Sequence, residues 1–250
     1  MPLRAVDIGP LSVCVLLRRL QIHGIETSAY GSFNTDLGPL TSCPLLEHLD
    51  LSECSSTMDH PRTDLGPLSS ATNLKSLRMS YCDGFLDLSP LSAAPAGCSG
   101  SLECLVLDHC RVEDLSPLAA CKALVHLDVT GCRDLSDLTP LASCLALVHL
   151  ATGECSRVED LSALASCHAL RYLDLHGCYL VTDLSPLASC PLLEHLDLNC
   201  GRRTLKFYGK GVTDLSPLAS CPALKLLNIV NSGVTDLSPL DALVEIVISI

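Results

Sequence analysis

The sequence predicts an α/β solenoid, with a parallel β-sheet on the concave side and 3₁₀ or irregular turns on the convex side. Two observations predict this fold class. A short motif of the form Asp-Leu-Ser-Pro-Leu returns along almost all of the 250-residue chain. Each copy is followed by leucines that alternate with polar residues, which is typical of a strand with one buried face. A unit with one such strand cannot bury its apolar side alone, so the units stack.

The copies of the motif set the expected domain boundaries. They begin near residues 7, 36, 64, 87, 114, 137, 160, 183, 214 and 236. The basic period is 22 or 23 residues, and the longer intervals contain insertions. We therefore expect a single domain over residues 6–250, with nine full repeats, a truncated tenth and no second domain.

Each repeat has two halves with different patterns. In the seventh repeat, Leu173 and Leu175 alternate with Tyr172, Asp174 and His176, as in a half-buried strand. In the other half a proline directly follows a serine. Serine at the N-cap and proline at the first helical position start a helical turn. Too few residues remain for an α-helix, so a short 3₁₀ turn is expected.

Composition excludes several classes of function. The chain has 28 acidic and 16 basic residues and a formal charge of −12, so neither a nucleic acid nor an anionic membrane surface is an expected partner. Tryptophan is absent and aromatic residues make up 3% of the chain, which excludes a stacking platform for single strands. No apolar run reaches 18 residues, so we expect no membrane insertion. Arg18 and Arg19 stand where a signal peptide would be cleaved, which favours a cytoplasmic protein.

The sixteen cysteines fall almost entirely into two columns of the repeat. One column follows the turn, at residues 14, 43, 121, 144, 167, 190 and 221, with Cys98 displaced by an insertion. The other ends the strand, at residues 54, 82, 110, 132, 155, 178 and approximately 200. Stacked columns would have nearly parallel Cβ vectors, whereas a disulfide needs converging ones, and no pair has the Cys-x-x-Cys spacing of a zinc knuckle. We expect thiols in the core, and neither a metal nor a cofactor.

A family resemblance follows from these motifs. Residues 181–198 read Val-Thr-Asp-Leu-Ser-Pro-Leu-Ala-Ser-Cys-Pro-Leu-Leu-Glu-His-Leu-Asp-Leu. This segment resembles the short repeats of bacterial internalins and of phosphatase-regulator leucine-rich-repeat proteins. Its cysteine-containing wording is also similar to leucine-rich-repeat proteins of trypanosomatids. The resemblance covers roughly residues 6–250 and implies a leucine-rich-repeat horseshoe, a fold whose members bind very different partners.

Polar strand residues supply the first candidate site. Residues that flank the buried leucines are expected on the concave face, where an incomplete histidine column runs beside an incomplete aspartate column. These pairs recur because the repeat recurs, and no single nucleophile and base stand out, so we expect no catalytic residues and no enzyme. We expect a surface for another protein with a basic segment; a solvated face inherited by duplication is the alternative. The candidate residues are His48, Asp50, Arg78, His126, Asp128, His149, Tyr172, Asp174, His176, His195 and Asp197.

An insertion over residues 201–211 supplies the second candidate site. It is unlike the rest of the chain, and loops that leave a rigid scaffold often carry function. A neutral surface insertion is the alternative, because lengthening a loop costs little. The candidate residues are Arg202, Arg203, Lys206, Phe207, Tyr208 and Lys210.

The ends of the chain and its function complete the expectations. The first repeat begins close to Met1, and the last strand carries apolar residues such as Ile246 and Ile248. We therefore expect a fragment of a longer protein, and self-association through uncapped ends is left open. The predicted function is a protein-binding scaffold. The alternatives are a regulatory subunit that docks on a phosphatase-like enzyme, and a surface recognition or antigen protein whose signal peptide is missing.

Overall fold

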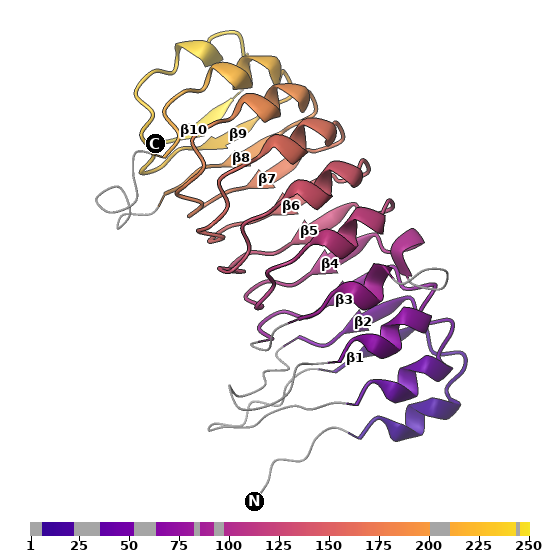
Figure 1. The fold of residues 1–250 in the computed structure, drawn as a ribbon. Coiled ribbons are helices and arrows are strands. Elements are labelled where there is room, and N and C mark those ends of the chain that lie inside the picture. Colours follow the sequence, from indigo (N-terminus) through magenta and orange to yellow (C-terminus); the bar gives the residue numbers. More distant parts are fainter. Residues whose placement is uncertain are drawn as a thin grey trace, which may run out of the picture.

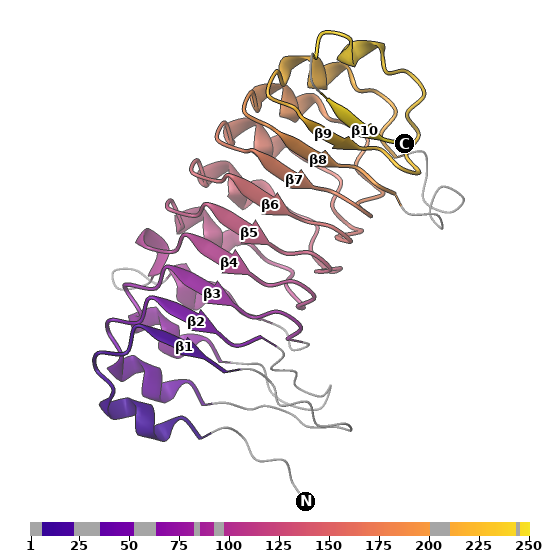
Figure 2. The same cartoon turned by 180° about the vertical axis from the view of Figure 1, so that it is seen from behind.

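Ten parallel strands form one sheet in chain order, each paired with the next. The computed structural model describes residues 7–22, 36–52, 64–82, 86–92, 98–200, 211–243 and 246–250. The strands are stacked like rungs from the N-terminal to the C-terminal end (Figures 1 and 2). They are β1 (Arg19–Gln21), β2 (His48–Asp50), β3 (Ser76–Arg78), β4 (Cys104–Val106), β5 (His126–Asp128), β6 (His149–Ala151), β7 (Tyr172–Asp174), β8 (His195–Asp197), β9 (Leu226–Asn228) and β10 (Val247–Ser249).

Short 3₁₀ helices stack in a second row on the other side of the solenoid (Figure 1). They are η1 (Gly9–Val13), η2 (Gly38–Ser42), η3 (Gly66–Ser70), η4 (Ser89–Ser92), η5 (Cys98–Gly100), η6 (Ser116–Ala120), η7 (Thr139–Ser143), η8 (Ser162–Ser166), η9 (Ser185–Ser189), η10 (Ser216–Ser220) and η11 (Ser238–Leu240). The predicted architecture, with a parallel concave sheet and 3₁₀ turns on the convex side, is therefore confirmed.

Leucines from both halves of each repeat fill the space between the sheet and the turns. In the seventh repeat Leu173 and Leu175 enter from the strand, and Leu164 and Leu170 enter from the turn side, each at most 2% exposed. The middle leucines of neighbouring strands lie in register, so that Leu173 pairs with Leu150 on one side and with Leu196 on the other. The result is one continuous core from Ile8 to Leu240.

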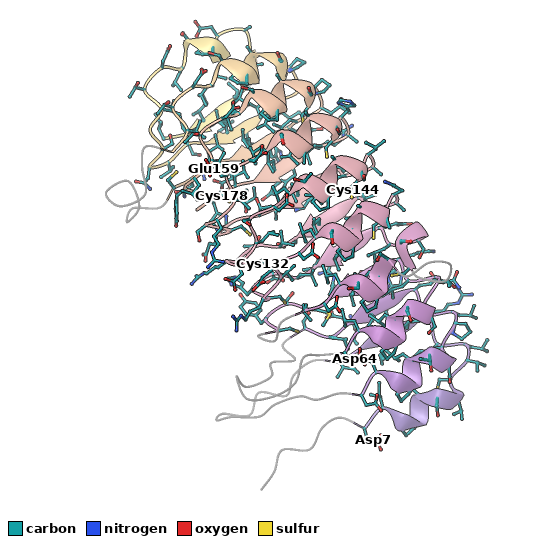
Figure 3. All side chains as sticks on the ribbon, in the orientation of Figure 1. Asp7, Asp64, Cys132, Cys144, Glu159 and Cys178 are labelled. Carbon is teal, nitrogen blue, oxygen red and sulfur yellow. The ribbon has the colours of Figure 1, made fainter. Side chains whose placement is uncertain are left out.

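In each copy of the motif, an aspartate and not the serine that the sequence suggested holds the start of the 3₁₀ turn. Asp183 Oδ1 accepts the backbone N–H of Ser185 at 2.8 Å, and Ser185 is the first residue of η9. The same bond, over two residues, recurs in all ten copies of the motif. Asp7 and Asp64 lie at the entrance to their turns in Figure 3. The serine hydroxyl adds a second bond to the carboxylate in several repeats, for example from Ser116 to Asp114 at 2.8 Å.

Removal of one cap is expected to destabilise the solenoid measurably. Asp160 accepts the N–H of Ser162 at 2.7 Å and its hydroxyl at 3.0 Å. We expect Asp160→Ala to lower the free energy of unfolding by about 1 kcal/mol, as loss of an N-cap does. Asp160→Asn keeps an acceptor oxygen and should cost less. Urea unfolding followed by circular dichroism measures both; equal losses would show that the cap is not what matters at this position.

The seventh repeat lacks the proline that stands second in the other turns of the motif. η8 reads Ser-Ala-Leu-Ala-Ser, whereas η9 and η10 read Ser-Pro-Leu-Ala-Ser. Its backbone leaves the turn as in η7, with φ −90° and ψ 62° at Cys167 against −92° and 66° at Cys144. We expect Ala163→Pro to raise the free energy of unfolding by about 0.5 kcal/mol, because proline restricts the unfolded chain. A lower unfolding midpoint in urea would contradict this expectation.

Both cysteine columns lie in the core and connect neighbouring repeats. Thirteen of the fifteen described cysteines are buried, and all fifteen are free thiols; Cys54 lies outside the described residues. Thiols after the turn donate to a carbonyl of the preceding turn, as Cys144 does to Leu118 at 3.4 Å. Thiols that end the strand donate to the preceding strand end, as Cys155 does to Val129 at 3.1 Å. Cys144 lies beside the turns and Cys132 and Cys178 lie at the opposite edge (Figure 3).

Candidate functional site

Two rows of side chains run across the concave face, perpendicular to the strands. The first residues of β5 to β8 stand in register, and we call them the ring row: His126, His149, Tyr172 and His195. The third residues also stand in register, and we call their acids the aspartate row: Asp128, Asp174 and Asp197, with Ala151 between the first two. The structure therefore places seven of the residues singled out in the sequence side by side.

The rings of the ring row stack on one another. The centroids of His126 and His149 are 4.1 Å apart, with an angle of 16° between the ring planes. His149 and Tyr172 are also 4.1 Å apart and nearly parallel, at 5°. His195 meets Tyr172 edge-on, at 6.0 Å and 78°. The stack follows from the repeat itself, because strand neighbours are about 4.8 Å apart and stacked rings need a similar spacing.

Burial keeps the two stacked histidines neutral. Desolvation lowers the pKa of His149 to about 4, helped by the neighbouring His126 and opposed by Asp128 and Asp174. Desolvation also lowers the pKa of His126. At neutral pH His126 and His149 therefore carry no charge, so neither ring offsets the negative charge of the neighbouring aspartate row.

The lowered pKa of His149 predicts a loss of stability in acid. An unfolded histidine takes up its proton near pH 6.5, whereas the folded one does so only near pH 4. Between these values the unfolded state binds more protons, so stability falls as the pH falls. We expect His149 to contribute about 1 kcal/mol of this loss, given its partial exposure. His149→Tyr, which keeps the stack, should flatten the pH dependence of urea unfolding between pH 6.5 and 4.5; an unchanged slope would contradict the assignment.

The aspartate row has a structural task that the sequence did not reveal. Each carboxylate accepts the backbone N–H two residues further on, so that Asp128 holds Thr130 at 2.9 Å and Asp197 holds Asn199 at 2.8 Å. In the ninth repeat Asn228 does the same for Val230 at 3.1 Å. An amide oxygen therefore suffices to close the strand end, and the negative charges are not required for that bond.

His176 lies beyond the end of β7, outside the ring row. Its Nδ1 lies 2.8 Å from Asp174 Oδ1, and this hydrogen bond raises the pKa of His176. The ring rests on Gly153, where a Cβ atom would come within 2.1 Å of it. Within the described ranges no hydrogen bond joins His176 to a hydroxyl or thiol, so the pair has no nucleophile to activate. No group of three or more metal-ligating side chains is found among the described residues either.

The remaining concave candidates form a second group at the N-terminal end. His48, Asp50 and Arg78 lie on β2 and β3, separated from the ring row by β4 with Cys104 and Val106. They line a hollow of about 310 Å³. A smaller hollow of about 220 Å³ lies at the other end of the ring row, against β9 and β10. The predicted concave residues are thus divided into an N-terminal and a C-terminal group.

The loop candidates cannot be placed in the same way. Arg202, Arg203, Lys206, Phe207, Tyr208 and Lys210 lie outside the described residues. In the ranges that the structure does describe, no helix has the length and apolar character needed to cross a membrane.

Each repeat contributes one strand and a 3₁₀ turn, and in most repeats a cysteine ends the strand. This arrangement defines the leucine-rich-repeat solenoid as the class of the fold. A Leucine Rich Repeat family profile matches residues 169–192, which contain β7 and η9. No curated protein sequence matches the chain.

Solved structures extend the likeness over most of the chain. Internalin C2 from Listeria monocytogenes is 26% identical, covers 73% of this chain and 74% of its own, and superposes with a TM-score of 0.57. An internalin, inlF, from the same organism is 21% identical over 97% of this chain and 76% of its own, with a TM-score of 0.52. A plant peptide hormone receptor, RGFR1, in complex with RGF2 is 13% identical over 93% of this chain and 37% of its own, with a TM-score of 0.59. The two likenesses below 25% identity establish the fold alone. The resemblances to phosphatase regulators and to trypanosomatid proteins stay predictions from the sequence.

Proposed function

We propose that the chain is a non-enzymatic protein-binding scaffold whose concave face receives a partner segment with basic residues. The aspartate row carries this proposal. Its backbone task needs only an oxygen, as Asn228 demonstrates, yet three repeats place a full negative charge there, beside rings that burial keeps neutral. Lysine and arginine have apolar stems that pack on rings and cationic heads that seek carboxylates. The ring row therefore suits the apolar stem of such a side chain, and the aspartate row suits its cationic head.

The rigidity of the sheet supports the same function. The rows are held by strand pairing and by the bonds from each aspartate to the following backbone, so a partner does not have to order them on binding. RGFR1, which has the same fold, is seen in complex with RGF2. We propose by analogy that this chain also presents its concave face to a protein or peptide.

Two further parts of the proposal concern the loop and the compartment. We propose that residues 201–211, with Arg202, Arg203 and Lys206, make a second contact with the partner. We also propose a reducing, cytoplasmic location, since fifteen described cysteines are free thiols. The likeness to internalin C2 favours a recognition protein of internalin type as the second candidate function. A phosphatase-docking subunit stays a third candidate on the sequence resemblance alone.

The decisive experiment removes charge without removing the backbone bonds. The triple variant Asp128→Asn, Asp174→Asn, Asp197→Asn keeps an acceptor oxygen at each position. The matched control, Glu113→Gln, Glu159→Gln, Asp241→Asn, removes the same charge from exposed residues that make no ion pair within the described ranges. Partners captured from source lysate by the wild-type chain are identified, purified and titrated against all three proteins by calorimetry.

We expect a partner with a basic segment that binds the triple variant at least about tenfold more weakly than the wild type, since each lost charge pair is worth about 1 kcal/mol or more. The control should bind within about twofold of the wild type. An equal loss of affinity in the triple variant and the control would indicate general attraction to an acidic protein. No loss of affinity in either variant would show that the aspartate row is not part of the binding surface.

A further inference from the structure

Two arginines on the concave face differ from all the other described arginines in having no acidic partner. Five of the seven form ion pairs across neighbouring repeats. These five are Arg18, Arg111, Arg133, Arg157 and Arg171. Within the described ranges Arg19 and Arg78 make no ion pair, and both are exposed. The other arginines in the described part of the chain each pair with a carboxylate of the molecule itself.

Both unpaired arginines line one hollow. Arg19 is the first residue of β1 and Arg78 is the last residue of β3, so they lie diagonally across β2. The hollow between them measures about 310 Å³. Its other polar lining consists of Gln21, His48, Asp50 and Ser76. The two guanidinium groups are therefore brought to the same concave space from two strands that are not neighbours.

The charges around the hollow favour a single negative group. Among the described residues that line the hollow, Asp50 is the one acid, and its Oδ1 already accepts the backbone N–H of Ser52 at 3.1 Å and its hydroxyl at 2.7 Å. Two guanidinium groups against one carboxylate leave one positive charge uncompensated. A bound monoanion neutralises that charge. A dianion would leave an excess negative charge in the hollow, which is unfavourable in a chain with a formal charge of −12. A planar carboxylate also matches the fork of a guanidinium, which donates two parallel hydrogen bonds.

We propose that this hollow is a carboxylate-binding site for an acidic residue, or the C-terminal carboxylate, of the same partner segment that lies on the ring and aspartate rows. The inference rests on the proposed function for the identity of the partner. It also defines a spacing, because β2 and β7 are five strand spacings apart, about 24 Å at 4.8 Å each. In an extended segment this distance corresponds to about seven residues. The partner then carries its acidic group at one end and its basic residues about seven residues away.

The test uses a small probe that contains the carboxylate and no basic group. N-acetyl-glutamate methylamide and its glutamine analogue are titrated into the full ¹⁵N-labelled chain at constant ionic strength, and backbone amide shifts are followed by NMR. We expect saturable shifts at β1 to β3 with the glutamate probe, at millimolar concentration, and none with the glutamine probe. Arg19→Gln with Arg78→Gln should weaken binding at least tenfold. Arg78→Lys, which keeps the charge and loses the fork, should lie between.

The matched control is Arg133→Gln with Arg157→Gln, which removes two exposed, ion-paired arginines from another part of the surface. It should bind the glutamate probe within twofold of the wild type. Equal shifts with both probes, or equal loss in both double variants, would overturn the site. An N-acetyl-phosphoserine probe that binds more than tenfold tighter than the glutamate probe would overturn the assignment to a carboxylate. Because no probe contains a basic group, failure here leaves the aspartate-row proposal standing, and the reverse also holds.

Discussion

Alkylation of the native protein is expected to be confined, among the described cysteines, to the partly exposed Cys14 and Cys104. The thirteen buried thiols should react at least about a thousandfold more slowly. Burial raises the pKa of Cys121, Cys132 and Cys190 to about 12. A thiol with such a pKa is about one part in ten thousand thiolate at pH 8, and the thiolate is the reactive form. Reagent also reaches these sulfur atoms only when repeats open locally.

Mass spectrometry after a timed exposure to iodoacetamide at pH 8 measures this contrast residue by residue. The control is the same reaction in guanidinium chloride, where all sixteen cysteines of the sequence should react. Rapid labelling of Cys144 or Cys167 in the native protein would contradict their place in the core. The outcome also bears on the proposed compartment, because a chain isolated with its core thiols oxidised would not have the structure described above.

The fold could be predicted from the sequence because its information is repeated. The alternation around Leu173 and Leu175 is weak in one strand, but the same pattern returns along the chain with a turn motif at a regular interval. A regular interval also places equivalent residues in register, which is why His126, His149 and Tyr172 could be assigned to one face before their rings were seen to stack. The repeat pattern does not, however, predict which hydrogen bonds and ion pairs the side chains form.

Bonds to the backbone account for most of what the sequence did not predict. Serine and aspartate are both good caps, so the pattern Asp-Leu-Ser-Pro does not show which one closes the turn; the chain path places Asp183 two residues before the first turn residue. The same reason hid the second task of Asp128, which caps its own strand end. The hollow between Arg19 and Arg78 depends on which arginines find carboxylates in neighbouring repeats, and that is decided by side-chain contacts that repeat spacing does not encode.

Left-handed backbone at the strand exit is a further feature without a clear sequence signal. Gly131 has φ of 74° and Gly177 has φ of 70°, yet Tyr81, His109 and Glu154 adopt φ between 55° and 59° at the same place in their repeats. Glycine in two repeats is consistent with a left-handed conformation, but the bulky residues in three other repeats do not predict it. Because side chains other than glycine cost about 1 kcal/mol or more in this region, these positions are held by the backbone bonds between repeats, such as Tyr81 N–H to Asp108 O at 2.8 Å.

Gly131→Ala is expected to lower the free energy of unfolding by about 2 kcal/mol, through two separate causes. The first is the left-handed backbone, at φ of 74°, which costs alanine about 1 kcal/mol. The second is the imidazole of His109, whose Nδ1 would lie 2.5 Å from the new Cβ atom. That ring stacks on Tyr81 at a centroid distance of 4.6 Å, so it cannot move away without loss of the stack.

A double-mutant cycle separates the two causes, since neighbouring residues show non-additive effects only when they interact. In a His109→Ala background the ring contact is absent, and Gly131→Ala should then cost only the backbone part, about 1 kcal/mol. Gly100→Ala is the matched control, because a Cβ atom there meets nothing within 4 Å. Urea unfolding of the four cycle members gives the coupling energy. If Gly131→Ala lowers the free energy of unfolding equally with and without His109, the ring contact does not contribute to the loss. If the loss equals that of Gly100→Ala, the left-handed backbone does not contribute either.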